Sequence, residues 1–206
     1  MSRSLFFKLK AAEEESQAAL SALDKARIDI LHAGLGLLQP MRLGLVEGLS
    51  GENGVLSTQC QEKAYLLAED VSSGQTKIQL QETEGLASGR EICLFDQTNG
   101  ELKTVSGVEG ATVSFSSPLT SSFLQAEASL VLLERTSIYF DQSRGMIRRK
   151  VNLSPAQPLL EDVAGFDFRY EKDTNLVTLN LWLIANKEKN YERAVYPKNM
   201  GLALQK

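Results

Sequence analysis

The acidic side chains and the single histidine are the residues of this sequence that could do chemistry. Glu161 and Asp162 are adjacent carboxylic acids, but neighbouring residues of a strand point to opposite faces, so they do not form a glycosidase pair. His32 has no serine or cysteine near it in a nucleophile motif, which favours a capping or interface histidine over a base. The sequence has no nucleophile elbow, phosphate loop or dinucleotide fingerprint. We therefore expect no enzyme and no cofactor, and a hydrolase that uses exposed acids is the weaker alternative.

The residues that could bind a metal or form a disulfide are few. Asp96, Asn99 and Glu101 carry oxygen ligands that suit calcium, but their spacing is more typical of a plain hairpin turn. Cys60 and Cys93 with one histidine cannot supply the four ligands of a zinc site, so we expect no metal. The two cysteines are either one disulfide, in an oxidising compartment, or two small buried thiols, and both interpretations stay open.

The charge balance excludes general nucleic-acid binding as a function. The 206-residue chain has a formal net charge of −4, and its one basic run is Arg144 with Arg148, Arg149 and Lys150. In this acidic context the run indicates a solvated hairpin rather than a phosphate site. No apolar run reaches the ~20 residues of a membrane span. Residues 1–10 mix apolar and basic side chains, without the cleavage pattern of a signal peptide.

A long helix rich in alanine and glutamate over Ala11–Leu38 is the first element that the sequence predicts. Its apolar residues recur with the 3.6-residue helical period, and Pro40 prevents its continuation. We expect its C-terminal half, from about Leu23, to be buried under the chain's own sheet and its N-terminal half to face partners. The residues expected at this helical partner interface are Ala19, Leu20, Leu23, Ala26 and Ile30.

The rest of the chain is expected to be β-structure. From Gly74 onward the apolar period changes to two, and turn residues separate the runs. Asn99-Gly100 predicts one hairpin, and two more are expected at residues 137–152 and 166–184. The expected organisation is a helix at 1–40, a connecting loop region at 41–73, an inserted small β-subdomain at 74–135 and a C-terminal antiparallel sheet at 136–206.

Several segments resemble the PilW/GspJ group of prepilin-like proteins, the minor pilins of type IV pili and pseudopilins of type II secretion. Residues 26–34 resemble the end of that group's first helix, and residues 85–94 resemble the entry to its inserted β-unit. Residues 137–149 resemble its Tyr–Asp and Leu–Arg hairpin, residues 157–170 its Pro-Leu segment and following strand, and residues 196–199 its C-terminal strand. The resemblance implies a pilin-like α+β fold, with one long N-terminal helix packed on antiparallel sheet.

The resemblance also implies a function and a location. It implies a structural subunit that packs its helix against other minor pilins or pseudopilins, at the tip or priming complex of a pilus or pseudopilus. Members of the group begin with a leader and an apolar helix that this sequence lacks, so it corresponds to the soluble part of an inner-membrane-anchored, periplasmic or extracellular protein. A divergent relative without an anchor is the other possibility.

The alternative function is an extracytoplasmic module of pilin-like fold that binds cargo, a surface or a sugar. A shallow cleft lined by aromatic side chains would support this alternative. Its candidate residues are Tyr139, Phe140, Tyr170 and Trp182, although core packing accounts for most of them.

Overall fold

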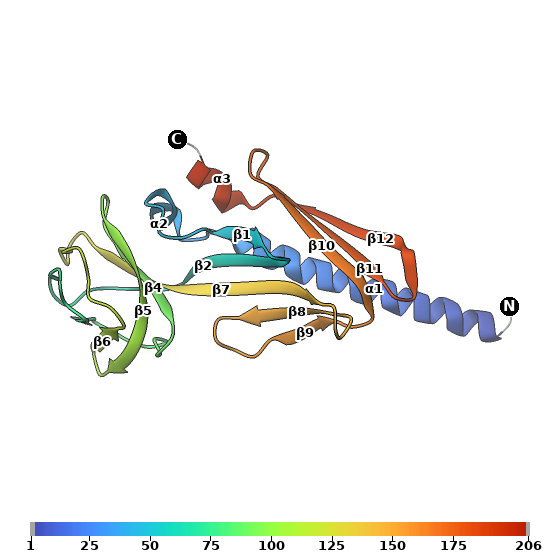
Figure 1. Ribbon diagram of the computed structural model, residues 1–206, viewed down its shortest axis with the longest axis horizontal. Coiled ribbons are helices and arrows are strands. Elements are labelled where there is room, and N and C mark those ends of the chain that lie inside the picture. Colours follow the sequence, from blue (N-terminus) through green and yellow to red (C-terminus); the bar gives the residue numbers. More distant parts are fainter. Residues whose placement is uncertain (1–2, 205–206) are drawn as a thin grey trace.

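The computed structural model describes residues 3–204 and contains three helices and two antiparallel sheets in that range (Figure 1). Helix α1 spans Arg3–His32, α2 spans Leu38–Arg42 and α3 spans Lys198–Leu204. Figure 1 shows that the first turns of α1 extend beyond both sheets, whereas α2 and α3 lie near the opposite end of the helix.

The larger sheet has nine strands and is organised around its longest strand, β7. Over residues 129–132 β7 pairs with β4, over residues 136–141 it pairs with β8, and β2 pairs with it along its other edge. The strand order is β1-β2-β7-β4-β5-β6-β3, with β8 on β7 and β9 on β8. The strands are β1 Leu49–Glu52, β2 Val55–Tyr65, β3 Lys77–Gln79, β4 Glu91–Phe95, β5 Gly100–Glu109, β6 Thr112–Phe115, β7 Ser129–Asp141, β8 Met146–Val151 and β9 Gln157–Leu160.

The smaller sheet has three strands in chain order, β10 Val163–Glu171, β11 Leu176–Leu183 and β12 Asn186–Val195. Residues 177, 179, 181 and 183 of β11 are buried, and the residues between them are half-buried. The strict alternation therefore gives this sheet one core face and one outer face. The three hairpins expected from the turn residues are confirmed as β4–β5, β7–β8 and β10–β11.

The expected pilin-like α+β fold is wrong, because the chain is mostly antiparallel β-sheet. Twelve strands accompany three helices in the described range, and only one of those helices is long. The expected loop region at 41–73 contains β1 and the 11-residue strand β2, which lies beside β7 in the large sheet. The Gly-rich stretch around Asn53 and Gly54 is a tight turn between these two strands, since both residues have positive φ angles.

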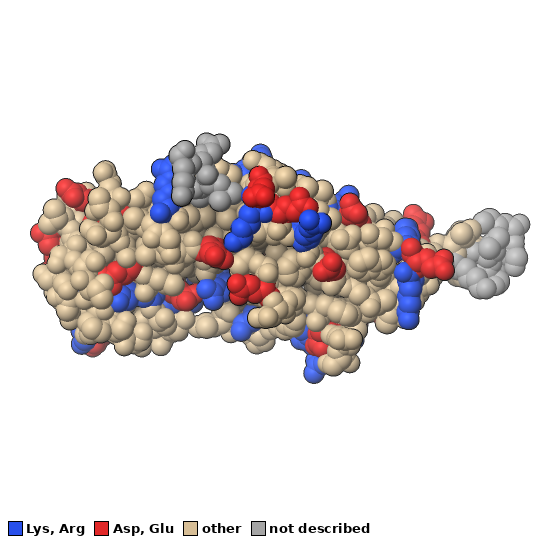
Figure 2. Space-filling model, turned by 45° about the horizontal axis from the view of Figure 1, so that its top comes forward, with Lys and Arg blue, Asp and Glu red and all other residues tan. Residues whose placement is uncertain are grey.

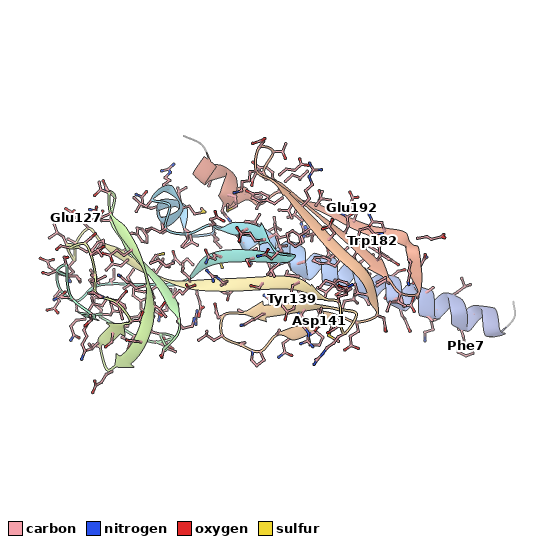
Figure 3. The ribbon with its side chains drawn as sticks, in the orientation of Figure 1. Phe7, Glu127, Tyr139, Asp141, Trp182 and Glu192 are labelled. Atoms are coloured by element: carbon pink, nitrogen blue, oxygen red, sulfur yellow. The ribbon has the colours of Figure 1, made fainter. Side chains whose placement is uncertain are left out.

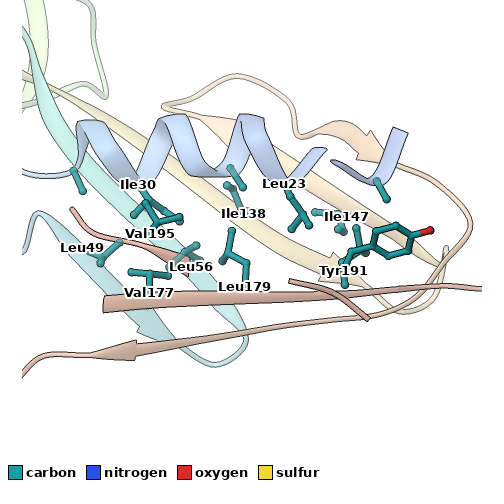
Figure 4. Close-up of a cluster of buried hydrophobic side chains, with 14 of the residues drawn as sticks. Leu23, Ile30, Leu49, Leu56, Ile138, Ile147, Val177, Leu179, Tyr191 and Val195 are labelled. Carbon is teal, nitrogen blue, oxygen red and sulfur yellow. The ribbon is translucent and has the colours of Figure 1, made fainter. Parts of the chain in front are cut away.

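One apolar core is shared by α1 and both sheets (Figure 4). Leu23 and Ile30 of α1 face Leu56 of β2, Ile138 of β7 and Leu179 of β11, and all five are at most 1% exposed. Burying a leucine or isoleucine side chain is worth about 1.5–3 kcal/mol, so the apolar stripe of α1 is stabilised by strands that lie far from it in the sequence.

A second core fills the part of the large sheet built from β3 to β6. It contains Ile92, Leu94, Val105 and Phe123, together with the first residues of β7. The expected inserted subdomain at 74–135 contributes most of this core, but Tyr65 and Leu67 precede that range. Because β2 and β7 run through both cores, the two parts share continuous strands.

At the end of α1, the backbone of Gly34 lies directly against the backbone of β2 and of the segment before β1. Gly34 follows the helix with a φ of 75°, and its N–H donates to the carbonyl oxygen of Gln59 at 2.8 Å. A Cβ atom on Gly48 would lie 2.9 Å from the Gly34 Cα. The segment that precedes β1 therefore packs directly on the glycine that ends the helix.

Most of the basic run of the β7–β8 hairpin is used within the fold. Arg149 makes two hydrogen bonds to Asp29 of α1, at 2.7 and 2.8 Å, and Arg148 Nε lies 2.9 Å from Asp141 Oδ2. Arg144 lies 4.0 Å from the same Asp141 carboxylate. The interpretation as a hairpin is confirmed, but Arg148 and Arg149 are 15% and 26% exposed and lie in ion pairs, so the expectation that the run is solvated is wrong for these two residues.

Candidate ligand-binding groove

The face of the large sheet that points away from the α1 core carries the best candidate site. Register places Ser50, Ser57, Ser137 and Lys150 in one row across β1, β2, β7 and β8. Since side chains alternate along each strand, this row and its neighbours at every second residue share one face. The opposite face carries Leu56 and Ile138, which belong to the core.

Arg135 of β7 lies at the centre of this face, and its guanidinium group is held on two sides. On one side, its Nη2 lies 3.4 Å from Glu91 Oε2. On the other side, the Gln59 amide is oriented so that its Oε1 accepts hydrogen bonds from Arg135 Nε at 3.1 Å and Nη2 at 2.7 Å. Its backbone N–H donates to Asn152 Oδ1 at 2.8 Å. The side chain is 49% exposed, so the guanidinium is oriented and still accessible.

A pocket lies on each side of Arg135, and together with it they form what we call the Arg135 groove. The pocket towards β8 has a volume of about 360 Å³, and the pocket towards β1 about 290 Å³. The first is lined by Gly89, Arg90, Glu91, Thr104, Leu133, Arg135, Ser137, Lys150, Asn152 and Leu153, and the second by Leu45, Val46, Glu47, Ser50, Ser57, Gln59, Leu102 and Arg135.

The pocket towards β8 has more positive than negative charge in its lining. Arg90, Arg135 and Lys150 contribute cations, whereas Glu91 is the one acid among its lining residues. Arg90 is tied to Glu62 and to the carbonyl oxygen of Leu133. Within residues 3–204, Lys150 has no carboxylate within ion-pair distance, so its ammonium group is free to meet a ligand.

The face of the molecule drawn in Figure 2 carries mixed charges. Acidic and basic side chains are interspersed along its long axis, with no large area of one sign. This mixed face agrees with the net charge of −4 and shows no basic stripe of the kind typical of nucleic-acid binding.

The aromatic residues expected to line a cleft lie on different parts of the fold. Phe140 and Tyr170 pack against the main core, and Tyr139 is on the same face of the large sheet as Arg135. Trp182 is on the outer face of the small sheet, against Gly165, so Tyr139 and Trp182 come from different sheets (Figure 3). The four side chains therefore do not line one aromatic cleft.

The residues expected at a helical partner interface are mostly covered by the chain itself. Ala19, Leu23, Ala26 and Ile30 are at most 1% exposed and belong to the main core. Leu20 is 39% exposed. In the folded chain, Leu20 is therefore the member of this set that a partner could reach.

The two cysteines are free thiols in this structure. Cys60 of β2 is paired with Glu134, and Cys93 of β4 is paired with Val131 of the same strand β7. Residues three apart on a strand point to opposite faces, so the two thiols lie on opposite faces of the sheet and cannot approach each other. Burial, followed by the charge of Glu134, raises the pKa of Cys60 to about 11, and burial raises the pKa of Cys93 to about 12.

The residues singled out in the sequence for their possible chemistry do not form a site together. Asp96 accepts hydrogen bonds from the backbone N–H groups of Asn99 and Thr98, which lower its pKa and close the β4–β5 turn. Glu161, Asp162 and His32 are exposed. No group of three histidine, cysteine or acidic residues in the described range is placed to hold a metal ion.

Glu101 forms a buried network that orders the loop after β6. Its carboxylate accepts hydrogen bonds from the backbone N–H groups of Thr120 and Ser121 and lies 2.9 Å from Lys103 Nζ. Burial raises the pKa of Glu101, but the Lys103 ammonium and the two N–H donors outweigh it and hold the pKa below its usual value. Lys103 in turn donates to the carbonyl oxygen of Pro118.

The groove residues were missed in the sequence because each is unremarkable alone. In the sequence, Gln59 falls in the expected loop region at 41–73, Arg135 is the last residue of the expected subdomain at 74–135, and Lys150 belongs to the basic run. The sequence pattern that predicts this site is the alternation of polar residues, at 57 and 59 in β2 and at 135 and 137 in β7, because such alternation indicates one polar face on each strand.

No protein family model matches this sequence, and no curated protein matches it. Solved structures that match parts of it include the Gp54 tailspike of Acinetobacter baumannii bacteriophage AP22, in complex with A. baumannii capsular saccharide, at 19% identity and a TM-score of 0.33. They also include the gp61 tailspike of Pseudomonas phage phi297, at 21% identity and a TM-score of 0.33. The phage phi92 endosialidase matches at 11% identity and a TM-score of 0.24.

These matches cover limited parts of both partners. They span 37%, 36% and 68% of this chain, and 15%, 14% and 33% of the respective phage proteins. At such TM-scores the likeness defines neither the whole fold nor the function of this chain.

The resemblance to the PilW/GspJ group is wrong. No pilin family model matches the sequence, and the described chain is mostly antiparallel β-sheet rather than a helix packed on one sheet as in a pilin. The function as a structural subunit of a pilus or pseudopilus is corrected with it. The expected partners, other minor pilins and the inner membrane, lose their basis for the same reason. No helix in the described range is long and apolar enough to cross a membrane.

Proposed function

We propose that this chain is a non-catalytic, extracytoplasmic ligand-binding module whose Arg135 groove holds a carbohydrate that carries a carboxylate group. The observation that carries the proposal is the position of Arg135. Its guanidinium is oriented by Gln59 and Glu91, is 49% exposed, and separates two polar pockets.

A carboxylate is the group that this centre would bind best. The planar guanidinium presents paired N–H donors that match the two oxygens of a carboxylate. Lys150 lies in the same pocket and adds a second cation without an ion-pair partner in the described range. Glu91 neutralises part of the Arg135 charge, so the groove favours a ligand with single, spaced negative charges over a polyanion.

A carbohydrate accounts for the remaining polar lining. Ser50, Ser57 and Ser137 supply hydroxyl groups, and Asn152 supplies an amide, all of which can donate to and accept from sugar hydroxyls. Sites for drug-like molecules are mostly apolar and enclosed, whereas these pockets are polar and open. Two pockets on either side of Arg135 would accept the sugar units that flank the acidic one.

The lining supports binding rather than catalysis. Glycosidases commonly use two carboxyl groups, and the pocket towards β8 contributes only Glu91, which is engaged by Arg135. Glu47, in the pocket towards β1, lies beyond Arg135 along the groove. An extracytoplasmic location belongs to the proposal because acidic glycans of this kind are found on cell surfaces.

Calorimetry with uronic-acid and sialic-acid oligosaccharides, each paired with its methyl ester, tests this proposal. Arg135→Gln should weaken binding of an acidic oligosaccharide about tenfold or more, because a charge-assisted hydrogen bond is lost. Arg135→Lys should recover part of the affinity, since it keeps the charge without the planar fork. Arg144→Gln removes an equally charged side chain, 64% exposed, from the β7–β8 turn and should leave binding unchanged.

The methyl esters provide the decisive comparison. They keep every hydroxyl and remove the negative charge, so they should bind much more weakly than the acids. Equal binding of acid and ester, or binding that survives Arg135→Gln, would contradict the proposal. Binding by none of the acidic oligosaccharides would contradict it as well.

A further inference from the structure

The first turns of α1 expose large apolar side chains that the fold does not use. Phe6, Phe7 and Leu9 are 55%, 57% and 52% exposed, and Figure 1 shows this end of the helix beyond both sheets. Contiguous exposed apolar residues of this size usually mark an interaction surface. Figure 3 shows Phe7 at the free end of the helix, on the side of the ribbon where β8 and β9 lie.

A pocket lined by both apolar and acidic residues lies further along the same helix. Its volume is about 240 Å³, and it is formed where α1 meets the end of β9 and the β11–β12 turn. Ala18, Leu160, Leu183 and Ala185 supply its apolar lining. Its acidic lining residues are Glu15, Glu161 and Asp162.

Helical periodicity places Phe7 on the side of the helix that leads to this pocket. Ala18 follows Phe7 by eleven residues, which is close to three turns of 3.6 residues, so the two side chains point in nearly the same direction. Ala11 and Glu14 lie between them on this side of the helix. Phe6 points about 100° away from Phe7, because each residue turns the helix by that angle.

We propose that a second copy of this chain docks antiparallel on this side of α1, so that Phe7 of each copy fills the pocket beside Ala18 of the other. A twofold axis between Ala12 and Glu13 makes both contacts at once, as an isologous interface requires. The arrangement is independent of the Arg135 groove, which lies on the opposite face of the large sheet from the core that holds α1.

The charges along α1 favour this occupant and this direction. Lys10 already lies 3.7 Å from Glu14 of its own helix, and both side chains are more than 60% exposed. In the antiparallel pair, Lys10 also lies close to Glu14 of the second copy, because their positions along the helix axis differ by one residue, about 1.5 Å. The helix start is basic and residues 13–15 are acidic, so an antiparallel copy places opposite charges together, whereas a parallel copy places like charges together.

Sedimentation velocity over a concentration series of the 206-residue chain tests the inference. The unaltered chain should show a reversible monomer–dimer equilibrium. Phe7→Ser should raise the dissociation constant by about a hundredfold, because two buried aromatic contacts are lost per dimer. Phe6→Ser removes an equally exposed neighbour that points elsewhere and should leave the equilibrium nearly unchanged.

Charge exchange tests the direction of the two helices. Lys10→Glu should weaken the dimer because it faces Glu14 of the second copy, and adding Glu14→Lys should restore it. A monomer at all concentrations would overturn the inference. Equal loss with Phe6→Ser and Phe7→Ser would overturn it too, since that result indicates nonspecific apolar association. Failure of the double exchange to restore the dimer would refute the antiparallel arrangement.

Discussion

The contact between Arg149 of β8 and Asp29 of α1 gives a prediction whose size follows from the structure. Arg149 donates through Nε and Nη2 to both carboxylate oxygens of Asp29, and the side chains are 26% and 10% exposed. Arg149→Met keeps most of the aliphatic stem but leaves a nearly buried carboxylate without its partner. Breaking such a pair costs about 3 kcal/mol, towards the lower limit for buried pairs because Arg149 retains some contact with water.

Urea denaturation of four variants measures this cost. The free energy of unfolding is compared for the unaltered chain, Arg149→Met, Asp29→Leu and the double variant, which together form a double-mutant cycle. The double variant should be more stable than Arg149→Met alone, since it removes the unpaired carboxylate together with its partner. A loss below about 1 kcal/mol for Arg149→Met would refute the reasoning, because it would mean that water solvates Asp29 as well as Arg149 does.

Three further predictions concern the groove, a buried acid and a close backbone contact. Glu91→Gln should tighten binding of an acidic oligosaccharide severalfold in calorimetry, because it removes a negative charge that competes for Arg135. The pKa of Glu101 is lower in the folded chain than in the unfolded chain, where a glutamate carboxyl has a pKa of about 4.3. Ionised Glu101 therefore stabilises the fold at pH values above about 4.3, and this stabilisation is lost as the pH falls through the folded pKa. The urea midpoint of Glu101→Gln should consequently fall less on acidification than that of the unaltered chain. Gly48→Ala should destabilise the fold by about 1–3 kcal/mol in urea titration because its Cβ meets backbone, whereas Gly107→Ala, with open space around it, should be near neutral.

Local chemistry made the hairpins predictable from the sequence. Asn99-Gly100 and the turns after Asp141 and Tyr170 combine turn residues with flanking period-two runs, and the pairing in β4–β5, β7–β8 and β10–β11 confirms them. The long helix was also predictable, because its apolar stripe repeats over several turns. Its observed range, Arg3–His32, lies within the expected helical region 1–40 and ends before the expected Leu38.

The long central strand β2 was not predictable by the same signals. Its residues alternate imperfectly, with Thr58 and Gln59 both buried, because part of each face is covered by a different element. The glycines around it predict a loop, whereas Asn53 and Gly54 form a turn within the β1–β2 hairpin. A strand covered on both faces loses the alternation that identifies a half-buried one.

The sequence by itself determined where the chain turns, which residues of the helix are apolar and which strands pair as local hairpins, since these depend on neighbours within a few residues. Only the tertiary structure decided that β7 joins two cores, that Cys60 and Cys93 lie on opposite faces, and that Gln59, Arg135 and Lys150 share one groove. Those outcomes depend on pairing between strands far apart in the chain. The register that sets such pairing follows from the burial of a whole face rather than from any local motif.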